Sequence, residues 1–375
     1  MTGGSSALPF SDFGRAPGKL ILSGEHAVVY GAPAIALAVE KFTDVWFIPG
    51  LSSRGLHTAF ESLSAGAFYP IERIFQFKSA LDKRFDQFMR GELTVRQILE
   101  RPDDLAAYTF TALALFFRES QAKPSQSFPL SGQLTGRSDL PIGAGMGSSA
   151  SVIAATILLY EHLSGCALDI HERFRQVRFC ERLQHGRGSA IDAGTVVYGG
   201  INFVRGDDLE PIDLPRHSEL RSGQGWYWAL LGRPEATTGE CVAVVREKWG
   251  ADQELWQAFE DCTEAMRTAV TMCQDPTEII RANHALLARV GVVPGRTQAL
   301  IADIEQAGGA AKISGAGSVR GAHSGAAIVY MPDPESMSAL MTTKYQDIAW
   351  GPVNISKSGA RVQPASEAVA RDLNT

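Results

Sequence analysis

The chain has 375 residues, of which 45% are hydrophobic and 20% are charged, and this length is enough for two domains with sizeable cores. Its formal net charge of −6 argues against nucleic-acid binding, because a protein that binds the phosphate backbone needs a positive surface. A membrane role is excluded in the same way, since no apolar stretch reaches the roughly 20 residues of a membrane helix.

The N-terminal segment and the cysteines bear on the cellular compartment. Met1–Asp12 has neither the basic start nor the apolar run of a signal peptide. The five cysteines are odd in number and have no CxxC spacing, which is typical of reduced and mostly buried thiols. Both features predict a cytoplasmic protein.

Apolar runs and turn residues predict the order of the elements. Short apolar runs separated by glycine and proline indicate strands, and apolar residues at helical spacing indicate helices. The polar stretch Pro211–Gly225 is the best candidate for a domain boundary. The order favours an α+β fold of two layers over a doubly wound sheet. The predicted strands are Leu20–Leu22, Ala27–Tyr30, Ala34–Val39, Ser131–Thr135, Trp226–Leu231 and Ala326–Tyr330, and the predicted helices span residues 71–89, 104–117, 149–163, 170–184, 253–272, 276–289 and 297–306.

A glycine-rich segment, Pro141-Ile-Gly-Ala-Gly-Met-Gly-Ser-Ser-Ala150, carries the strongest chemical signal. Its three glycines let the backbone adopt positive φ and approach a ligand closely. They lead into a helix whose first N–H groups are unpaired, so the segment predicts an anion site. It is neither a Walker loop, which needs a lysine, nor the GxGxxG dinucleotide motif. A glycine-rich turn with ordinary serine caps is the alternative.

Charged residues stand at both ends of the first apolar strand. Lys19 opens the strand, and Glu25 and His26 lie on the turn that closes it. A solvated hairpin explains this pattern as well as a site does. If the segment is a functional site, Lys19 is a cation for a phosphate or a carboxylate, and His26 contacts the substrate.

Two carboxylates lie eleven residues apart in the middle of the chain. Glu181 shares a helix face with Phe174 and Val177, and a carboxylate on an apolar face is costly unless a cation meets it. That cation is either Arg178, in a structural salt bridge, or a metal. Asp192 ends the predicted loop Gly186–Asp192, from which it can present its carboxylate to a ligand.

These segments together resemble the GHMP kinases. The order of a lysine-bearing N-terminal strand, a PxGxGxGSSA loop and a late small-residue loop at Lys312–Ser318 is that of the superfamily, and Ala16–Gly31 resembles mevalonate kinases in particular. The resemblance implies a two-domain GHMP kinase-like fold with the nucleotide site in the cleft between the domains. Residues 1–215 would form the N-terminal domain with the ATP-binding loop and the catalytic aspartate, and residues 225–375 the C-terminal domain.

The resemblance also implies roles for residues at matching positions. Asp192 would be the catalytic aspartate and Lys19 its active-site lysine, and Glu25, His26 and Thr238 would contact the substrate. Mg²⁺ would be held by Ser149 and Glu181. ATP would be bound by Ser138, Gly143, Ala144, Gly145, Met146, Gly147, Ser148 and Ser149.

The implied activity is ATP-dependent phosphorylation of the primary hydroxyl of mevalonate or a mevalonate-like small molecule. Nucleic acid and membrane are not expected as partners, and a homodimer is left open. The alternatives are a kinase for another acceptor such as phosphomevalonate, a non-catalytic ligand sensor, and the related decarboxylase. The decarboxylase lacks the GEHAVVYG hairpin, and sensors tend to lose the catalytic lysine or carboxylate that this chain keeps.

Two segments depart from the pattern of the superfamily. The run before the aspartate is Gly188-Ser-Ala-Ile-Asp192, where the family usually has PSGID. The last loop continues after Gly317 as Ser-Val-Arg-Gly-Ala-His323 instead of GAGGGGC. Arg320 and His323 either contact phosphate or substrate, or they only reshape the loop.

Overall fold

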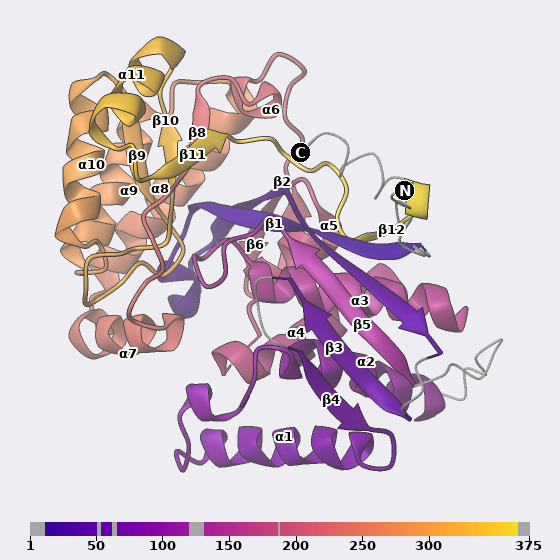
Figure 1. Ribbon diagram of the computed structural model, residues 1–375. Coiled ribbons are helices and arrows are strands. Elements are labelled where there is room, and N and C mark those ends of the chain that lie inside the picture. The colour runs from indigo at the N-terminus through magenta and orange to yellow at the C-terminus, as the bar shows by residue number, and fades with distance from the viewer. Residues whose placement is uncertain (1–11, 51–53, 62–65, 120–130, 187, 367–375) are drawn as a thin grey trace.

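The computed structural model describes residues 12–50, 54–61, 66–119, 131–186 and 188–366. All of the N-terminal segment but Asp12, and Arg187 of the predicted loop, lie outside these ranges. Figure 1 shows two sheets, each with its own helices, and the four-stranded sheet with its helices lies to one side of the larger sheet. The predicted α+β class is confirmed.

The larger sheet is built on two long, buried strands. β1 (Phe13–Ser23) is buried along its whole length, and it pairs with β2 (Ala34–Pro49) in antiparallel fashion. The strand order is β12-β1-β2-β5-β3-β4, and β6 and β7 extend from β2. The other strands are β3 (Gly55–Phe60), β4 (Ala67–Pro70), β5 (Gly132–Ser138), β6 (Ile201–Arg205), β7 (Asp208–Pro211) and β12 (Arg361–Gln363).

One central helix covers this sheet. α3 (Ser148–Ser164) is apolar on nearly all sides and is buried, as such a helix must be. Gly14 of β1 allows its close approach, since a Cβ there would lie 1.9 Å from the Ala155 carbonyl oxygen. The helical segments around α3 are α1 (Ile74–Met89), the 3₁₀ helix η2 (Val95–Gln97), α2 (Asp104–Glu119), α4 (Ile170–His185) and α5 (Ala190–Tyr198).

The smaller sheet is antiparallel, in the order β11-β8-β10-β9. A hydrophobic cluster that includes Leu20, Leu22, Trp226 and Ile328 joins β1 to this second sheet, so the two sheets share part of their core. The elements are β8 (Trp226–Leu230), β9 (Ala310–Ser314), β10 (Ala326–Tyr330), β11 (Ala349–Pro352), α6 (Glu219–Ser222), α7 (Thr238–Trp249), α8 (Gln253–Met272), α9 (Thr277–Arg289), α10 (Gly295–Gln306) and α11 (Pro334–Lys344).

The end of the chain returns to the larger sheet. β12 pairs with β1, with Phe13 opposite Gln363. The division into residues 1–215 and 225–375 stays a prediction, and under it this last strand would cross back to the N-terminal domain.

Two predicted elements were wrong. Ala27–Tyr30 is a 3₁₀ helix, η1, and not a strand, because Gly24 and His26 take positive φ values of 97° and 62° that turn the chain out of the extended conformation. The predicted loop Gly186–Asp192 ends early, because Ser189 caps α5 through its hydroxyl. Asp192 therefore lies in the first turn of a helix.

Two general expectations can be compared with the structure. No helix among the described residues is long and apolar enough to cross a membrane. All five cysteines lie in described segments as free thiols, and four of them are buried while Cys273 is exposed.

Candidate active site

The glycine-rich loop exposes backbone because alternate residues anchor it. Gly143, Gly145 and Gly147 have φ values of 71°, 81° and 75°, a conformation that favours glycine. Between them, the side chains of Ala144 and Met146 are buried. These two buried side chains thus anchor the loop, while the glycine backbone stays accessible.

The loop lies where the two sheets meet. The Lys19 N–H of β1 donates to the Met146 carbonyl at 2.9 Å, and the Ala326 N–H of β10 donates to the Ala144 carbonyl at 2.8 Å. One strand from each sheet therefore fixes the loop. Since these are backbone bonds, they hold the loop whatever its side chains do.

The first turn of α3 is open to an anion. Gly147 is the N-cap residue and supplies no side chain to cap the helix, so the first N–H groups have no side-chain cap. The Ser151 hydroxyl donates to the Ala16 carbonyl at 2.8 Å and holds this turn against β1. Uncapped N–H groups at the positive end of a 17-residue helix are well placed to bind phosphate.

Ser138 lies at the start of the loop, at the end of β5. Its hydroxyl is 2.7 Å from the Thr43 hydroxyl and accepts the Leu140 N–H at 3.2 Å. Both contacts are within the protein, and the residue itself is exposed. Its part in ATP binding stays a prediction.

Lys19 connects the loop to Asp192. The Lys19 ammonium and an Asp192 carboxylate oxygen are 2.8 Å apart, and the side chains are 4% and 19% exposed. A Cβ at position 147 would lie 2.8 Å from Cγ of Lys19, so the lysine stem packs directly on Gly147. The geometry therefore brings together the glycine loop, a cation and a carboxylate, three parts that sequence reasoning placed separately.

Glu181 is fully buried on α4. Neither of its carboxylate oxygens has a hydrogen bond of ordinary geometry with the described residues, and His185 Nε2 is 3.9 Å away. Burial raises the pKa of Glu181 well above its usual value, nearby Asp192 raises it further, and Lys19 opposes the shift. Arg178, the other cation considered for Glu181, forms an ion pair with Asp207 at 2.9 Å.

These oxygens suit a hard cation. The Ser149 hydroxyl is also buried without a hydrogen-bond partner among the described residues. Within the described ranges no three His, Cys, Asp or Glu residues gather to hold a metal. A donor set of one carboxylate and one hydroxyl fits Mg²⁺ bound to a nucleotide, because Mg²⁺ takes its other ligands from phosphates and water.

Glu25 and His26 are held by the strand β9 and the loop after it. Glu25 forms a buried ion pair with Lys312, which the sequence singled out only as the start of a loop. The His26 Nε2 lies 3.0 Å from the Ala316 carbonyl oxygen, while its Nδ1 is buried without a partner among the described residues. Burial lowers the pKa of His26, so the ring is neutral at pH 7. The sequence feature that could have indicated a buried partner for Glu25 is the position of Lys312 inside the short apolar strand Ala310–Ser314.

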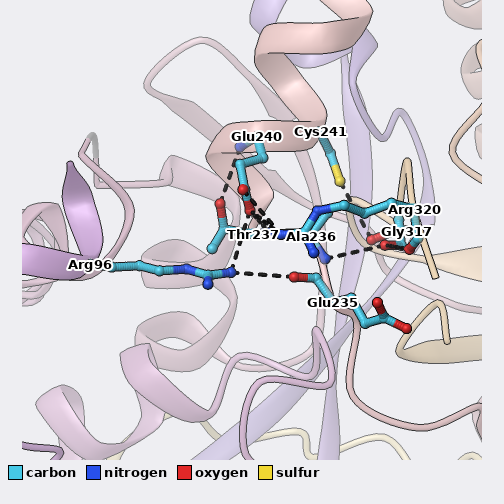
Figure 2. A network of polar contacts seen from close by, with 9 residues as sticks. Arg96, Glu235, Ala236, Thr237, Glu240, Cys241, Gly317 and Arg320 are labelled. Atoms are coloured by element: carbon cyan, nitrogen blue, oxygen red, sulfur yellow. Dashed lines mark hydrogen bonds and ion pairs between the residues drawn. The ribbon is translucent and has the colours of Figure 1, made fainter.

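Thr238 is exposed in the first turn of α7. The preceding Thr237 and Glu240 form a capping box, in which each side chain accepts the backbone N–H of the other. Figure 2 shows Glu240 between two arginines, with Arg96 at 3.4 Å and Arg320 at 3.1 Å. The start of α7 is thus linked to η2 on one side and to the late loop on the other.

The loop that departs from the superfamily pattern, residues 318–323, forms hydrogen bonds with other parts of the protein. The Ser318 hydroxyl accepts the Ala236 N–H at 3.3 Å and donates to the Arg320 carbonyl at 2.6 Å. The His323 Nδ1 is 2.9 Å from the Leu231 carbonyl oxygen. The side chains of this loop therefore contact the segment between β8 and α7 and, through Arg320, α7 itself, while the Ser318 N–H donates to the Val292 carbonyl at 2.9 Å.

Known proteins share this arrangement of segments. Residues 107–200 match the family model for the GHMP kinases N terminal domain. The chain is 29% identical over 366 residues to mevalonate kinase of Thermococcus gammatolerans, covering 93% of this chain and 97% of the relative. It is 28% identical over 346 residues to a phosphomevalonate kinase of Streptomyces sp., with 81% and 86% covered. The chain is thus similar to GHMP kinases in its family-model match and along most of its length.

The fold agrees with this similarity. The crystal structure of L. major mevalonate kinase in complex with R-mevalonate matches it with a TM-score of 0.65 and 20% identity, covering 96% of this chain and all of that one. The prediction of a two-domain GHMP kinase-like fold is confirmed, as is that of a phosphotransferase with an alcohol acceptor. Its relatives are named as kinases of small molecules, and kinases of this kind use ATP.

Proposed function

We propose that this protein transfers the γ-phosphoryl group of ATP to the primary hydroxyl of mevalonate, giving 5-phosphomevalonate. The observation that carries the proposal is the Lys19–Asp192 ion pair, which lies against Gly147 at the uncapped start of α3. A phosphate bound by that helix start would have both a cation and a proton acceptor beside it.

The protein groups divide the work of an in-line transfer. Backbone N–H groups of the glycine loop and the first turn of α3 bind the triphosphate. As the hydroxyl oxygen bonds to the γ-phosphorus and the bond to ADP breaks, Asp192 accepts the hydroxyl proton. Lys19 stabilises the charge that develops on the transferred group. Positioning supplies most of the rate enhancement, because the protein forms no covalent bond.

Ser149 and Glu181 would hold the magnesium ion. The support is their unpartnered, buried oxygens together with the raised pKa of Glu181, which a cation would reverse. An ion held by these two residues would neutralise part of the charge of the nucleotide phosphates.

The acceptor would lie against Glu25, His26 and Thr238, with the nucleotide in the cleft between a domain of residues 1–215 and one of residues 225–375. The mevalonate kinase-like hairpin Ala16–Gly31 supports this choice of acceptor, and so do relatives named for mevalonate. The retained Lys19 and Asp192 argue against a sensor that binds ligands without turnover.

A kinase for phosphomevalonate is the second candidate, because a relative of that name matches the chain almost as well. An ADP-release assay on the purified protein, with mevalonate, its 5-phosphate, galactose and homoserine as acceptors, decides between them. We expect turnover with mevalonate. Turnover with phosphomevalonate and none with mevalonate would refute the acceptor while leaving the kinase assignment intact.

A further inference from the structure

One face of β9 and the loop after it hold the end of β1 and the turn that follows. Alternate residues of a strand share a face, and two residues of this face of β9, Lys312 and Ser314, contact β1. The Lys312 ammonium donates to the Ile21 carbonyl at 3.3 Å, and the Ser314 hydroxyl accepts the Ile21 N–H at 2.7 Å. Two residues further on, the Ala316 carbonyl meets His26. β9 and the loop after it therefore contact the backbone at the end of β1 and the side chains of the proposed substrate turn.

The strongest of these contacts is the ion pair between Lys312 and Glu25. Both side chains are fully buried, and Oε2 of Glu25 has no hydrogen-bond partner among the described residues. A buried ion pair is a weak source of stability, because its desolvation cost can exceed the Coulombic gain and apolar replacements are often neutral or stabilising. Stability alone is therefore a poor reason for two charges at this position.

The pair continues into the proposed catalytic charges. Lys19 is near enough to Glu25 to lower the pKa of that carboxyl group, and its ammonium pairs with Asp192. Charges of opposite sign thus alternate from Lys312 through Glu25 and Lys19 to Asp192. This row runs from a strand of the smaller sheet to a helix that covers the larger one.

We infer that Lys312 is a positioning residue of the kinase, which acts through Glu25 to fix the substrate turn beside Lys19. The inference rests on the proposed function of that site. It assigns to the lysine before the late glycine loop a role in placing the acceptor.

The electrostatics of Glu25 make this role measurable. Burial raises the pKa of Glu25, and Lys312 is the group that opposes the shift most. The other titratable groups that interact with this pair are Lys19, Cys262 on α8 and His284 on α9, and the last two are neutral at pH 7 because burial raises the thiol pKa and lowers the imidazole pKa. Without Lys312, Glu25 would therefore ionise only at higher pH.

The test compares four variants: Lys312→Met, Glu25→Gln, the double variant, and Lys344→Met as a control. Lys344 also pairs with a carboxylate, that of Asp303, but the Lys344 side chain is exposed. For Lys312→Met we expect kcat/KM for the acceptor to fall at least ~10-fold at pH 7, with the KM for ATP within about 2-fold of wild type. The acid limb of its pH profile should move to higher pH, whereas Glu25→Gln and the double variant should lack the part of that limb that Glu25 contributes. Lys344→Met should behave as wild type.

The double variant makes the inference refutable even if Lys312→Met does not fold, because it leaves no unpaired charge. If Lys312 acts through Glu25, the double variant should match Glu25→Gln. Additive losses, or a pH profile of folded Lys312→Met that overlays the wild-type profile, would overturn the inference. The wild-type acceptor assay is run first: if the enzyme prefers another acceptor, the proposed function fails, and the four variants are compared with that acceptor instead.

Discussion

Replacement of Asp192 by Asn separates catalysis from binding at the proposed site. Asn keeps the shape but removes the negative charge and most of the capacity to accept a proton. We expect kcat to fall by about 10²-fold or more, the range of general-base catalysis, which corresponds to about 2.7 kcal/mol in the barrier. Binding of ATP should barely change, because backbone groups of the glycine loop hold the nucleotide.

The structure also sets the expected cost in stability. Lys19 is 4% exposed and would lose its partner at 2.8 Å, but Asp192 is 19% exposed, so solvent reaches one side of the pair. The loss should lie between that of an exposed pair and that of a fully buried one, at about 1–3 kcal/mol of unfolding free energy. The matched control is Asp207→Asn, which removes an exposed carboxylate from the ion pair with Arg178.

Steady-state kinetics, calorimetric titration with ATP and thermal unfolding give the three quantities. Lys19→Met should lose kcat to a similar extent, and the double variant should be little worse than either single one, because residues that act as a unit are not additive. An Asp192→Asn enzyme that keeps more than about a tenth of the wild-type kcat would remove Asp192 from the catalytic role. Losses in ATP affinity that match the loss in kcat would show instead that the ion pair only shapes the nucleotide site.

Two further substitutions test the metal and the phosphate site. Glu181→Gln should lower kcat and raise the Mg²⁺ concentration needed for half-maximal activity, because an amide is a poor ligand for a hard cation; a Mg²⁺ titration like that of wild type would make Glu181 structural. Because the pKa of Glu181 is raised in the folded state, the folded state loses stability as pH rises through that pKa. Without metal, the Gln variant should therefore melt at a higher temperature than wild type at pH 8, with a smaller difference at pH 5. Equal melting curves at both pH values would contradict this. Gly147→Ala should weaken ATP binding by at least ~10-fold in calorimetry, since the new Cβ would meet Lys19 at 2.8 Å and φ is 75°, whereas Gly239→Ala, which meets nothing, should bind as wild type.

The sequence was informative where the chemistry is local. The glycine loop and α3 are contiguous, so positive-φ glycines and the helix start could be placed from residue types alone. Local signals misled at Ala27–Tyr30, where an apolar run typical of a strand follows a non-glycine residue with positive φ. No local rule gives His26 that conformation, because its contact with Ala316, 290 residues away, helps to hold it.

Pairings between distant segments could not be predicted in the same way. Sequence reasoning proposed either Arg178 or a metal as the cation for Glu181, and only the fold shows that Arg178 pairs with Asp207. Likewise, Glu25 and Lys312 are 287 positions apart, and each has a simpler explanation alone. A charged residue in a buried segment predicts that an oppositely charged partner exists, but the identity of that partner depends on the topology of the fold.

The position of β1 explains why the site forms where it does. The middle of this strand pairs with β2 in the larger sheet, with Lys19 opposite Ala38, while its far end at Ile21 is held by β9 of the smaller sheet. The register with β2 shifts between Ile21 and Ser23, at the place where the second set of contacts begins. A residue that belongs to both sheets cannot move with either one alone. Lys19, two residues before that point, is therefore fixed relative to both halves of the proposed site, which is the requirement for a cation that must face a phosphate and a carboxylate at once.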